Sequence, residues 1–328
     1  MDYRQLIKDS WDYTQKNKRL IIWFGFLPSI LTTSVGIGYI AYQFFAFKKS
    51  WIFNETDESF LSDVVSFILE FVRNHVSWTV PLIIFAVIFA IFYFLFPTLA
   101  KASAIQKIAR NRNGQDATVG TGLKYGITSF LQLFEYHLLI KTFAFFSILF
   151  EMSFVLRNLG PVIFKLLLPV FLLFMVISFI LTLLFTYTDF FIVVDGMKVF
   201  DSMKRSGKLV LMHWKHTFLV TLLMIIISIR VVIQAFMVFL IPLVIVLVTG
   251  YIATVAVPSL AVILGGTAGF VALVIASYLN GIVDIFAYSV WTFTFLELTS
   301  QKEQSAREVV LEDDIDGHQD YSGHKNLR

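Results

Sequence analysis

Long apolar stretches set the strongest limit on how this chain can fold. Six of them are long enough for a helix to cross a bilayer, which takes about 20 residues. They cover residues 20–47, 79–100, 137–156, 162–193, 217–249 and 261–295. Because the hydrocarbon core offers no water to backbone groups, segments this apolar must satisfy those groups within helices. We therefore predict an all-α, polytopic membrane protein, a bundle of six transmembrane helices.

The composition agrees with a membrane as the solvent of this chain. Apolar residues make up 57% of the sequence and charged residues 15%, whereas soluble domains have about 25% charged residues. The first apolar stretch is much longer than the roughly 7–15 residues of a signal-peptide core. We expect it to remain as an uncleaved first span.

The basic residues predict the orientation, because Lys and Arg gather on the cytoplasmic side of membrane helices. With the N-terminus inside, 19 of the 26 Lys and Arg residues fall in cytoplasmic segments and 4 in outer ones. We therefore expect a multi-pass protein of the cytoplasmic (inner) membrane with both termini inside.

One alternative stays open for residues 217–297. Residues 241–266 are apolar throughout and are interrupted by Pro242, Gly250 and Pro258. The region could hold three spans, which would place the C-terminal tail outside. Two long helices with an apolar connector are the preferred interpretation.

Each odd-numbered span follows an amphipathic segment. Apolar residues at helical spacing form one stripe on a helix, and beside a span this is typical of a helix in the membrane interface. The three stripes are Tyr3, Ile7, Trp11 and Thr14; then Leu123, Ile127, Phe130, Leu131 and Phe134; and then Phe200, Met203, Val210 and Trp214. This pattern predicts three helical hairpins, each introduced by a cytoplasmic interfacial helix.

The predicted organisation has three parts. Residues 1–19 form the first cytoplasmic amphipathic helix, and residues 20–299 form the six-helix transmembrane domain. Residues 57–74 are amphipathic and acidic, which predicts a further helix on the outer surface. Residues 300–328 are polar and acidic without periodicity, so we predict a disordered cytoplasmic tail.

Charges within the predicted spans are the candidate functional residues. Each costs about 2.5–3.5 kcal/mol at a helix centre and needs a partner or a polar cavity. At 1.5 Å rise per residue, Arg230, Asp284 and Glu151 all lie roughly 20 Å from the cytoplasmic ends of their spans. Lys141 and Asp189 lie at matching depths, each about one turn inside the cytoplasmic boundary of its predicted span. We predict a cluster of the first three and a second pair, which fix helix register or line a path for a solute.

The sequence lacks the residue patterns of common active sites. It has no cysteine, and His213 and His216 are three apart with no third metal ligand in evidence. No nucleotide-binding loop or nucleophile elbow appears, and a net charge of +3 is too small to favour nucleic acid. We expect no enzymatic activity, cofactor, metal or nucleic-acid partner.

A short pattern follows the fourth predicted span. Gly196, Asp201, Ser206 and Leu209 match positions of the pattern Gly-(x)4-Glu-Ala-Leu-(x)2-Ser-(x)2-Leu, with Asp201 in place of the usual Glu. The segment resembles one found in a family of six-helix prokaryotic membrane proteins, which includes the membrane domain of some glycerophosphodiester phosphodiesterases. The resemblance implies the six-helix fold. The catalytic domain of those phosphodiesterases does not occur in this sequence, so their activity is not implied.

The same segment carries Lys204, Arg205 and Lys208, which can meet anionic lipid headgroups at about 1 kcal/mol each. We therefore expect a non-enzymatic, membrane-embedded interaction or envelope-support component. Its expected partners are the lipid bilayer, anionic headgroups and a further membrane protein. The alternative function is a small-solute or ion transporter that uses the intramembrane charges around Arg230.

Overall fold

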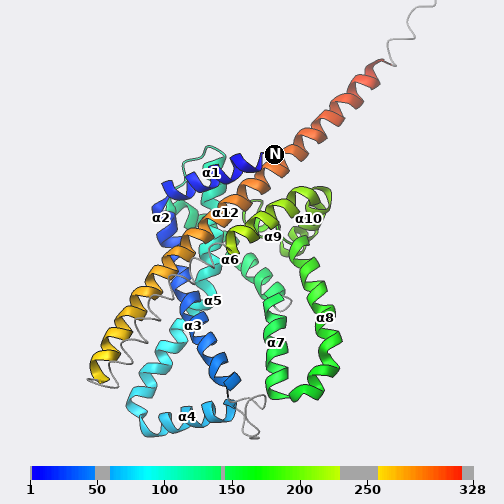
Figure 1. Ribbon diagram of the computed structural model, residues 1–328. Helices are drawn as coiled ribbons and strands as arrows, with labels where there is room; N and C mark the ends of the chain where they lie inside the picture. The colour runs from blue at the N-terminus through cyan, green and yellow to red at the C-terminus, as the bar shows by residue number, and fades with distance from the viewer. Residues whose placement is uncertain (1, 49–59, 142–144, 230–257, 320–328) are drawn as a thin grey trace, which may run out of the picture.

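The computed structural model describes residues 2–48, 60–141, 145–229 and 258–319. Within these ranges every regular element is helical (Figure 1). In chain order the elements are α1 (Tyr3–Lys16), α2 (Lys18–Leu20), the π-helical η1 (Ile21–Phe26), α3 (Leu27–Lys48), α4 (Phe60–Asn74), α5 (Val76–Arg112), α6 (Val119–Lys141), α7 (Phe145–Asn158), α8 (Gly160–Leu184), α9 (Thr188–Val193), α10 (Val199–Met212) and α12 (Pro258–Gln319). A helical segment, Trp214–Ile229, follows α10.

Four helical stretches are long and apolar enough to cross a bilayer: Lys18–Tyr39, Val76–Arg112, Gly160–Leu184 and Gly266–Ser300. A fifth is reached if α10 and Trp214–Ile229, which meet at a bend of 97°, form one broken span. The described chain is thus all-helical, with several helices suited to a membrane. The count of six spans stays a prediction, and residues 230–257, where a third C-terminal span was considered, lie outside the described residues.

Two predicted spans differ from the helices at their boundaries. The predicted third span, residues 137–156, begins inside α6, which continues to Lys141. The predicted fourth span, residues 162–193, is not one helix: α8 ends at Leu184, and a turn leads into the separate short α9. Asp189 therefore lies beyond the end of α8 rather than one turn inside it.

α12 extends past the part of the chain suited to a membrane. The sequence predicts disorder from residue 300, but α12 continues to Gln319 and projects away from the other helices (Figure 1). Glu, Gln, Lys, Arg and Ala make up most of residues 301–308, and these residues have high helix propensity. Extending an existing helix also avoids the cost of a new nucleus. Part of the predicted tail is thus helical.

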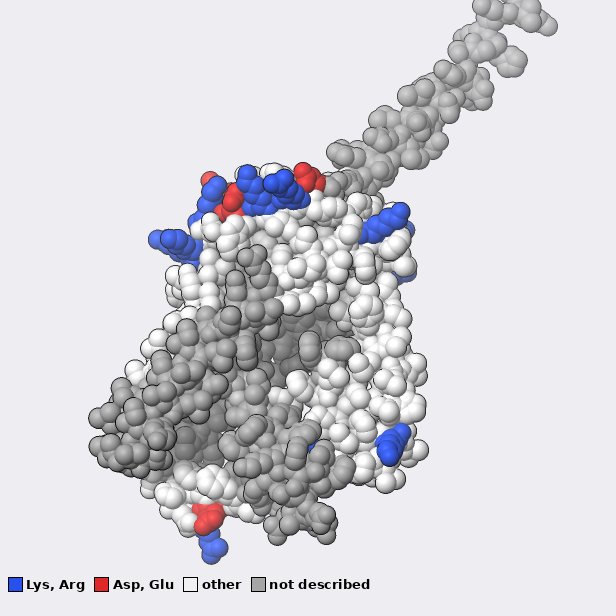
Figure 2. All heavy atoms as spheres, viewed as in Figure 1, with Lys and Arg blue, Asp and Glu red and all other residues white. Residues whose placement is uncertain are grey.

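The helices pack most closely at one end of the molecule, which we call the basic end; it carries α1, α2, α9, α10 and the loop between α5 and α6. One buried cluster, around Leu133 and Tyr187, joins α6, α9, α10 and α12. Another, around Ile108 and Ile285, joins α1, η1, α5 and α12. Lys and Arg gather at this end, and the flank below it is largely uncharged (Figure 2).

Glycines let the helix backbones approach one another near the basic end. Gly25 in η1 faces Gly281 in α12, and a Cβ on Gly281 would lie 2.6 Å from the carbonyl carbon of Gly25. Gly122 and Gly126 of α6 face Ser103 of α5, and a Cβ on Gly122 would lie 2.8 Å from the Ser103 carbonyl oxygen. Small residues permit such close crossings in membrane proteins, so these positions set the spacing of the bundle.

The amphipathic helices differ in what their apolar stripes contact. In α1, Thr14 of the predicted stripe is buried, and Trp11 meets Phe286 of α12 edge-on with ring centroids 5.6 Å apart. The α6 stripe turns Leu131 outward, whereas the stripe of α10 is divided, with Phe200 exposed and Val210 buried. An outward apolar stripe is what a helix in the bilayer interface requires. α4 lies at the opposite end, across α3 and α5 (Figure 1).

Candidate functional site

The break between α8 and α9 is bridged by a side chain from α10. Ser206 Oγ donates a hydrogen bond to the Leu184 carbonyl oxygen at 2.8 Å and accepts one from the Tyr187 backbone N–H at 3.0 Å. Ser206 is fully buried. Because backbone groups at helix ends lose their intrahelical partners, this hydroxyl supplies replacements. It also fixes α10 against the end of α8.

The other positions of the sequence pattern also have structural places. Gly196 turns the chain between α9 and α10 at a φ of +67°, a conformation that glycine adopts without strain. Asp201 is exposed in the first turn of α10, where a carboxylate complements the helix dipole. Leu209 is buried in the cluster around Tyr187. Together with Ser206, these residues determine where α10 lies.

The basic residues of α10 occupy its free side. Lys204, Arg205 and Lys208 are exposed, whereas Ser206 and Leu209 on the same helix are buried against the protein. Because α10 is anchored at the break, the three charges are held on a fixed element at the basic end.

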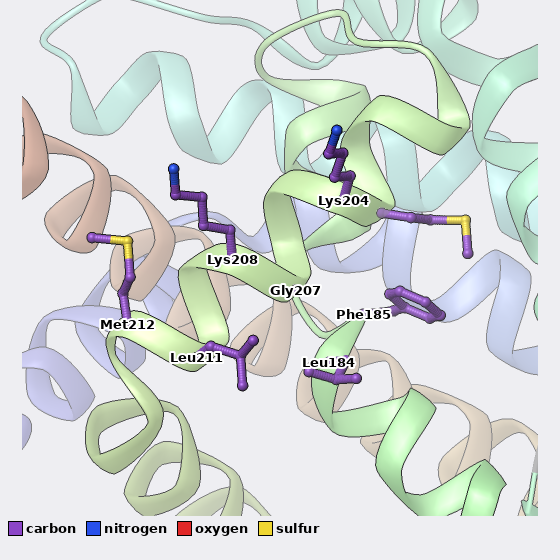
Figure 3. A pocket seen from close by; sticks show the side chains of 8 residues that line it. Leu184, Phe185, Lys204, Gly207, Lys208, Leu211 and Met212 are labelled. Atoms are coloured by element: carbon purple, nitrogen blue, oxygen red, sulfur yellow. The ribbon is translucent and has the colours of Figure 1, made fainter.

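A groove of about 680 Å³ lies between the end of α8 and α10 (Figure 3). Its lining is mostly apolar and consists of Leu184, Phe185, Met203, Gly207, Leu211 and Met212, together with Lys204 and Lys208. The side chains of Lys204 and Lys208 extend in the same direction, away from Leu184 and Leu211 (Figure 3). The groove therefore combines an apolar wall with two cationic groups along one edge.

A second polar site surrounds Asp189 at the start of α9. Lys101 of α5 forms a salt bridge with Asp189 Oδ2, and His137 Nε2 of α6 lies 3.3 Å from Asp189 Oδ1. Burial by itself would raise the pKa of the Asp189 carboxyl, but the neighbouring Lys101 and His137 outweigh burial and hold this pKa well below its usual range. The ionised carboxylate thus ties α5, α6 and α9 together.

The same histidine lines a cavity that is open to the surface. His137 and Thr98, whose Nδ1 and Oγ1 atoms are 3.4 Å apart, face a cavity of about 320 Å³ between α3, α5 and α6. The rest of the lining is mainly apolar and aromatic: Thr32, Tyr93, Phe94, Pro97, Phe134, Leu138 and Ile140. The ion pair of Asp189 therefore lies close to this open cavity, because His137 belongs to both.

The predicted cluster of three charges is described only in part. Asp284 of α12 accepts a hydrogen bond from Ser29 Oγ of α3 at 3.1 Å. Glu151 is exposed on α7. Arg230 lies outside the described residues, so its pairing with Asp284 stays a prediction.

The second predicted pair joined Lys141 with Asp189. The side chain of Lys141 is outside the described residues, and the partners that the structure assigns to Asp189 are Lys101 and His137. Sequence reasoning missed both of them. A signal was present, because Lys101 directly follows the predicted second span and His137 begins the third, the same boundary at which Asp189 was placed.

The structure places His213 and His216 in hydrogen-bonding and ring contacts. His216 Nδ1 forms a hydrogen bond with Tyr3 Oη of α1, and the rings of His213 and His216 are 6.2 Å apart. Within the described ranges, no group of three or more His, Cys, Asp or Glu residues could hold a metal ion.

Comparison with protein-family models, curated proteins and solved structures gives no match to this chain. The resemblance based on Gly196, Asp201, Ser206 and Leu209 accordingly stays a prediction. The structure defines an all-helical protein with several helices suited to a bilayer and a basic, grooved surface at one end.

Proposed function

We propose that this chain is a non-enzymatic, six-span protein of the cytoplasmic membrane that binds anionic lipid through α10. In this role it acts as a membrane-embedded interaction or envelope-support component. The basic end faces the cytoplasm, with both termini inside, and a further membrane protein is the expected partner.

The observation that carries the proposal is the division of α10 into two faces. Ser206 and Leu209 hold one face against the protein, and Lys204, Arg205 and Lys208 leave the other exposed and cationic. A basic residue near an anionic membrane surface contributes about 1 kcal/mol. Three of them on one anchored helix supply enough attraction to favour anionic over neutral headgroups.

Neutralisation of the exposed face tests the lipid contact. The triple variant K204Q/R205Q/K208Q should co-purify with much less anionic phospholipid than the parent, measured by lipid mass spectrometry after extraction in mild detergent. R73Q/K165Q changes two exposed basic residues of α4 and α8 and serves as the control, which should retain its lipid. Unchanged anionic lipid in the triple variant would show that the proposal is wrong.

The orientation is tested with single cysteines, since the chain has none of its own. In intact cells, a membrane-impermeant maleimide should label Arg73→Cys and leave Lys204→Cys unlabelled until the cells are opened. Labelling of Lys204→Cys in intact cells would place the basic end outside and contradict the proposed topology.

Transport of a small solute or ion is a second candidate, favoured by the cavity beside His137. Ionisable residues that border a cavity within a membrane protein often mark the path of a substrate or proton. Here the buried Asp189–Lys101 pair stands directly behind His137, and Asp284 lies on a neighbouring helix.

Two variants test the transport candidate. Thr98→Cys introduces a thiol into the cavity lining, and a transport role predicts its reaction with small water-soluble thiol reagents from both sides of the membrane. The double change R230L/D284L should then abolish the cellular phenotype of the protein. A folded double variant with its phenotype intact would exclude transport through these charges.

A further inference from the structure

The groove between α8 and α10 owes its open middle to Gly207. A Cβ at this position would meet no other atom within 4 Å, although Gly207 lies in the middle of α10. Leu184 and Phe185 form the wall on the α8 side, and Leu211 lies one turn after Gly207 on α10 (Figure 3). The groove has a volume of about 680 Å³ and is wide open to the surroundings, so an occupant would lie along the surface of the protein rather than inside it.

The lining of the groove is apolar and yet largely uncovered by protein. The side chains of Leu211 and Met212 are 69% and 52% exposed. Exposed apolar area of this kind is favourable only against another apolar surface. Phe200 and Trp214, close by in sequence, are exposed as well, and aromatic residues around a basic helix are typical of the bilayer interface. The natural occupant of the groove is therefore lipid.

The charges on the edge of the groove select the kind of lipid. Lys204 and Lys208 are one helical turn apart, so that both ammonium groups can reach a single phosphate. No acidic residue lines the groove, and no acidic side chain of the described residues forms an ion pair with either lysine. The cation of a zwitterionic headgroup would find only positive charge here, whereas an anionic headgroup is attracted.

We infer that the groove between α8 and α10 binds one molecule of anionic phospholipid from the leaflet at the basic end. Its phosphate lies between Lys204 and Lys208, and one acyl chain runs along Leu184, Phe185 and Leu211. The inference rests on the proposed function and deepens it, because it replaces a general attraction to anionic headgroups with a single site of defined stoichiometry.

Native mass spectrometry of the full chain in a neutral detergent tests this inference. The protein is titrated with phosphatidylglycerol, with phosphatidylcholine of the same acyl chains, and with glycerophosphoglycerol, which is the headgroup without chains. We expect one phosphatidylglycerol adduct to form about 30-fold more tightly than the phosphatidylcholine adduct. This factor corresponds to two lysines that each contribute about 1 kcal/mol to the binding of an anionic headgroup. The headgroup alone should give no adduct.

Two kinds of variant separate the charges from the groove. K204Q/K208Q removes the cations and should weaken the phosphatidylglycerol adduct by about 30-fold. Gly207→Phe fills the groove and leaves every charge in place, and Leu211→Gln makes its wall polar at a side chain too exposed to affect folding. Both should also lose the tight adduct. Phe200→Gln is the matched control, because Phe200 is equally exposed on α10 but does not line the groove.

The variants distinguish a headgroup contact on α10 from binding within the groove. If K204Q/K208Q loses the adduct while G207F and L211Q keep it, the headgroup contact stands and the groove inference is wrong. If K204Q/K208Q binds as the parent does, the proposed contact of α10 with anionic lipid falls as well. Equal affinity for both lipids, or binding of glycerophosphoglycerol alone, also overturns the inference.

Discussion

Side chains at the basic end are buried by neighbouring helices, whereas many in the opposite half of the same helices face outward. In α5, the run from Ala102 to Ala109 is entirely buried, but Leu82 and Phe85 are 48% and 65% exposed. α8 is exposed at its far end too, where Val162 and Leu166 are 79% and 76% exposed. One helix can therefore change along its length from a lipid-facing surface to a protein-packed one.

The difference follows from which interactions stabilise the association of helices in lipid. Between two helices in lipid, apolar contacts bring little gain over contacts with acyl chains, so association depends on close packing of small residues and on polar bonds. These features concentrate toward the basic end: the Gly25–Gly281 crossing, the Asp189 ion pair and the Ser206 bridge. The described part of the far half is rich in Leu, Ile and Phe, and many of these side chains are exposed rather than packed between helices.

The largest effect should come from the glycine crossing. Gly281→Leu would drive a side chain into the backbone of η1, where no flexible atom can yield. We expect the loss to exceed the usual cost of overpacking, about 1–3 kcal/mol, so that little folded protein remains. Size-exclusion chromatography and the apparent Tm in detergent measure this.

The matched control for the crossing is Gly36→Leu in α3. A Cβ at Gly36 meets nothing within 4 Å, so this variant should fold as the parent does. Equal yields of the Gly281 and Gly36 variants would show that the crossing does not hold the basic end together.

The buried ion pair should have the next largest effect. Lys101→Met leaves the Asp189 carboxylate with His137 as its remaining side-chain partner. Removing one member of a buried pair costs about 3–5 kcal/mol, and partial exposure of Lys101, 23%, places the expected loss at the lower end. The double variant K101M/D189L should regain most of it, which a double-mutant cycle on the unfolding free energy measures.

An exposed ion pair at the same end provides the comparison for Lys101. Arg112 and Asp9 are 3.2 Å apart, with the arginine side chain 46% exposed. Arg112→Gln should cost less than about 1 kcal/mol, as is usual for surface pairs. If both substitutions cost the same, burial of Asp189 does not strengthen its interactions.

The Ser206 bridge should have the smallest effect of the three. Ser206→Ala leaves the Leu184 carbonyl and the Tyr187 N–H without their partner, at a cost of about 1–3 kcal/mol. Ser202→Ala is the control on the same helix, because its hydroxyl is equally buried but has no hydrogen-bond partner among the described residues. A neutral Ser206 variant, or a Ser202 variant of equal cost, would contradict the assigned bridge.

Hydropathy predicted the helices well because it is a local property of the sequence. The stretches 20–47, 79–100, 162–193 and 261–295 each overlap a described helix long and apolar enough for a bilayer. The end of α8 could not be predicted in the same way. The polar residues Thr186, Thr188 and Asp189 are followed by a further apolar run from Phe190 to Val194, so average hydropathy does not mark the break. The side chain that bridges it comes from Ser206, 22 positions after Leu184.

The partners of the charged residues could not be predicted from their positions along the spans. Counting residues along a span locates a charge relative to the membrane surface, but it does not say which way the side chain points around the helix axis. Asp189 was matched by depth with Lys141, although Lys101 and His137 on two other segments reach it. Ser29, which donates a hydrogen bond to Asp284, carries no charge, so charge matching could not find it.

The serine bridge has a consequence for the order in which the protein is made. Leu184 leaves the ribosome 22 residues before Ser206. Tyr187, whose phenol forms a hydrogen bond with the Thr217 hydroxyl, leaves it 30 residues before Thr217. The C-terminal end of α8 therefore emerges before the residues that complete its hydrogen bonding. Until α10 is synthesised and folds back, water or the insertion machinery must satisfy the Leu184 carbonyl. The hydrogen bonds at the end of α8 are therefore completed only after α10 has been made.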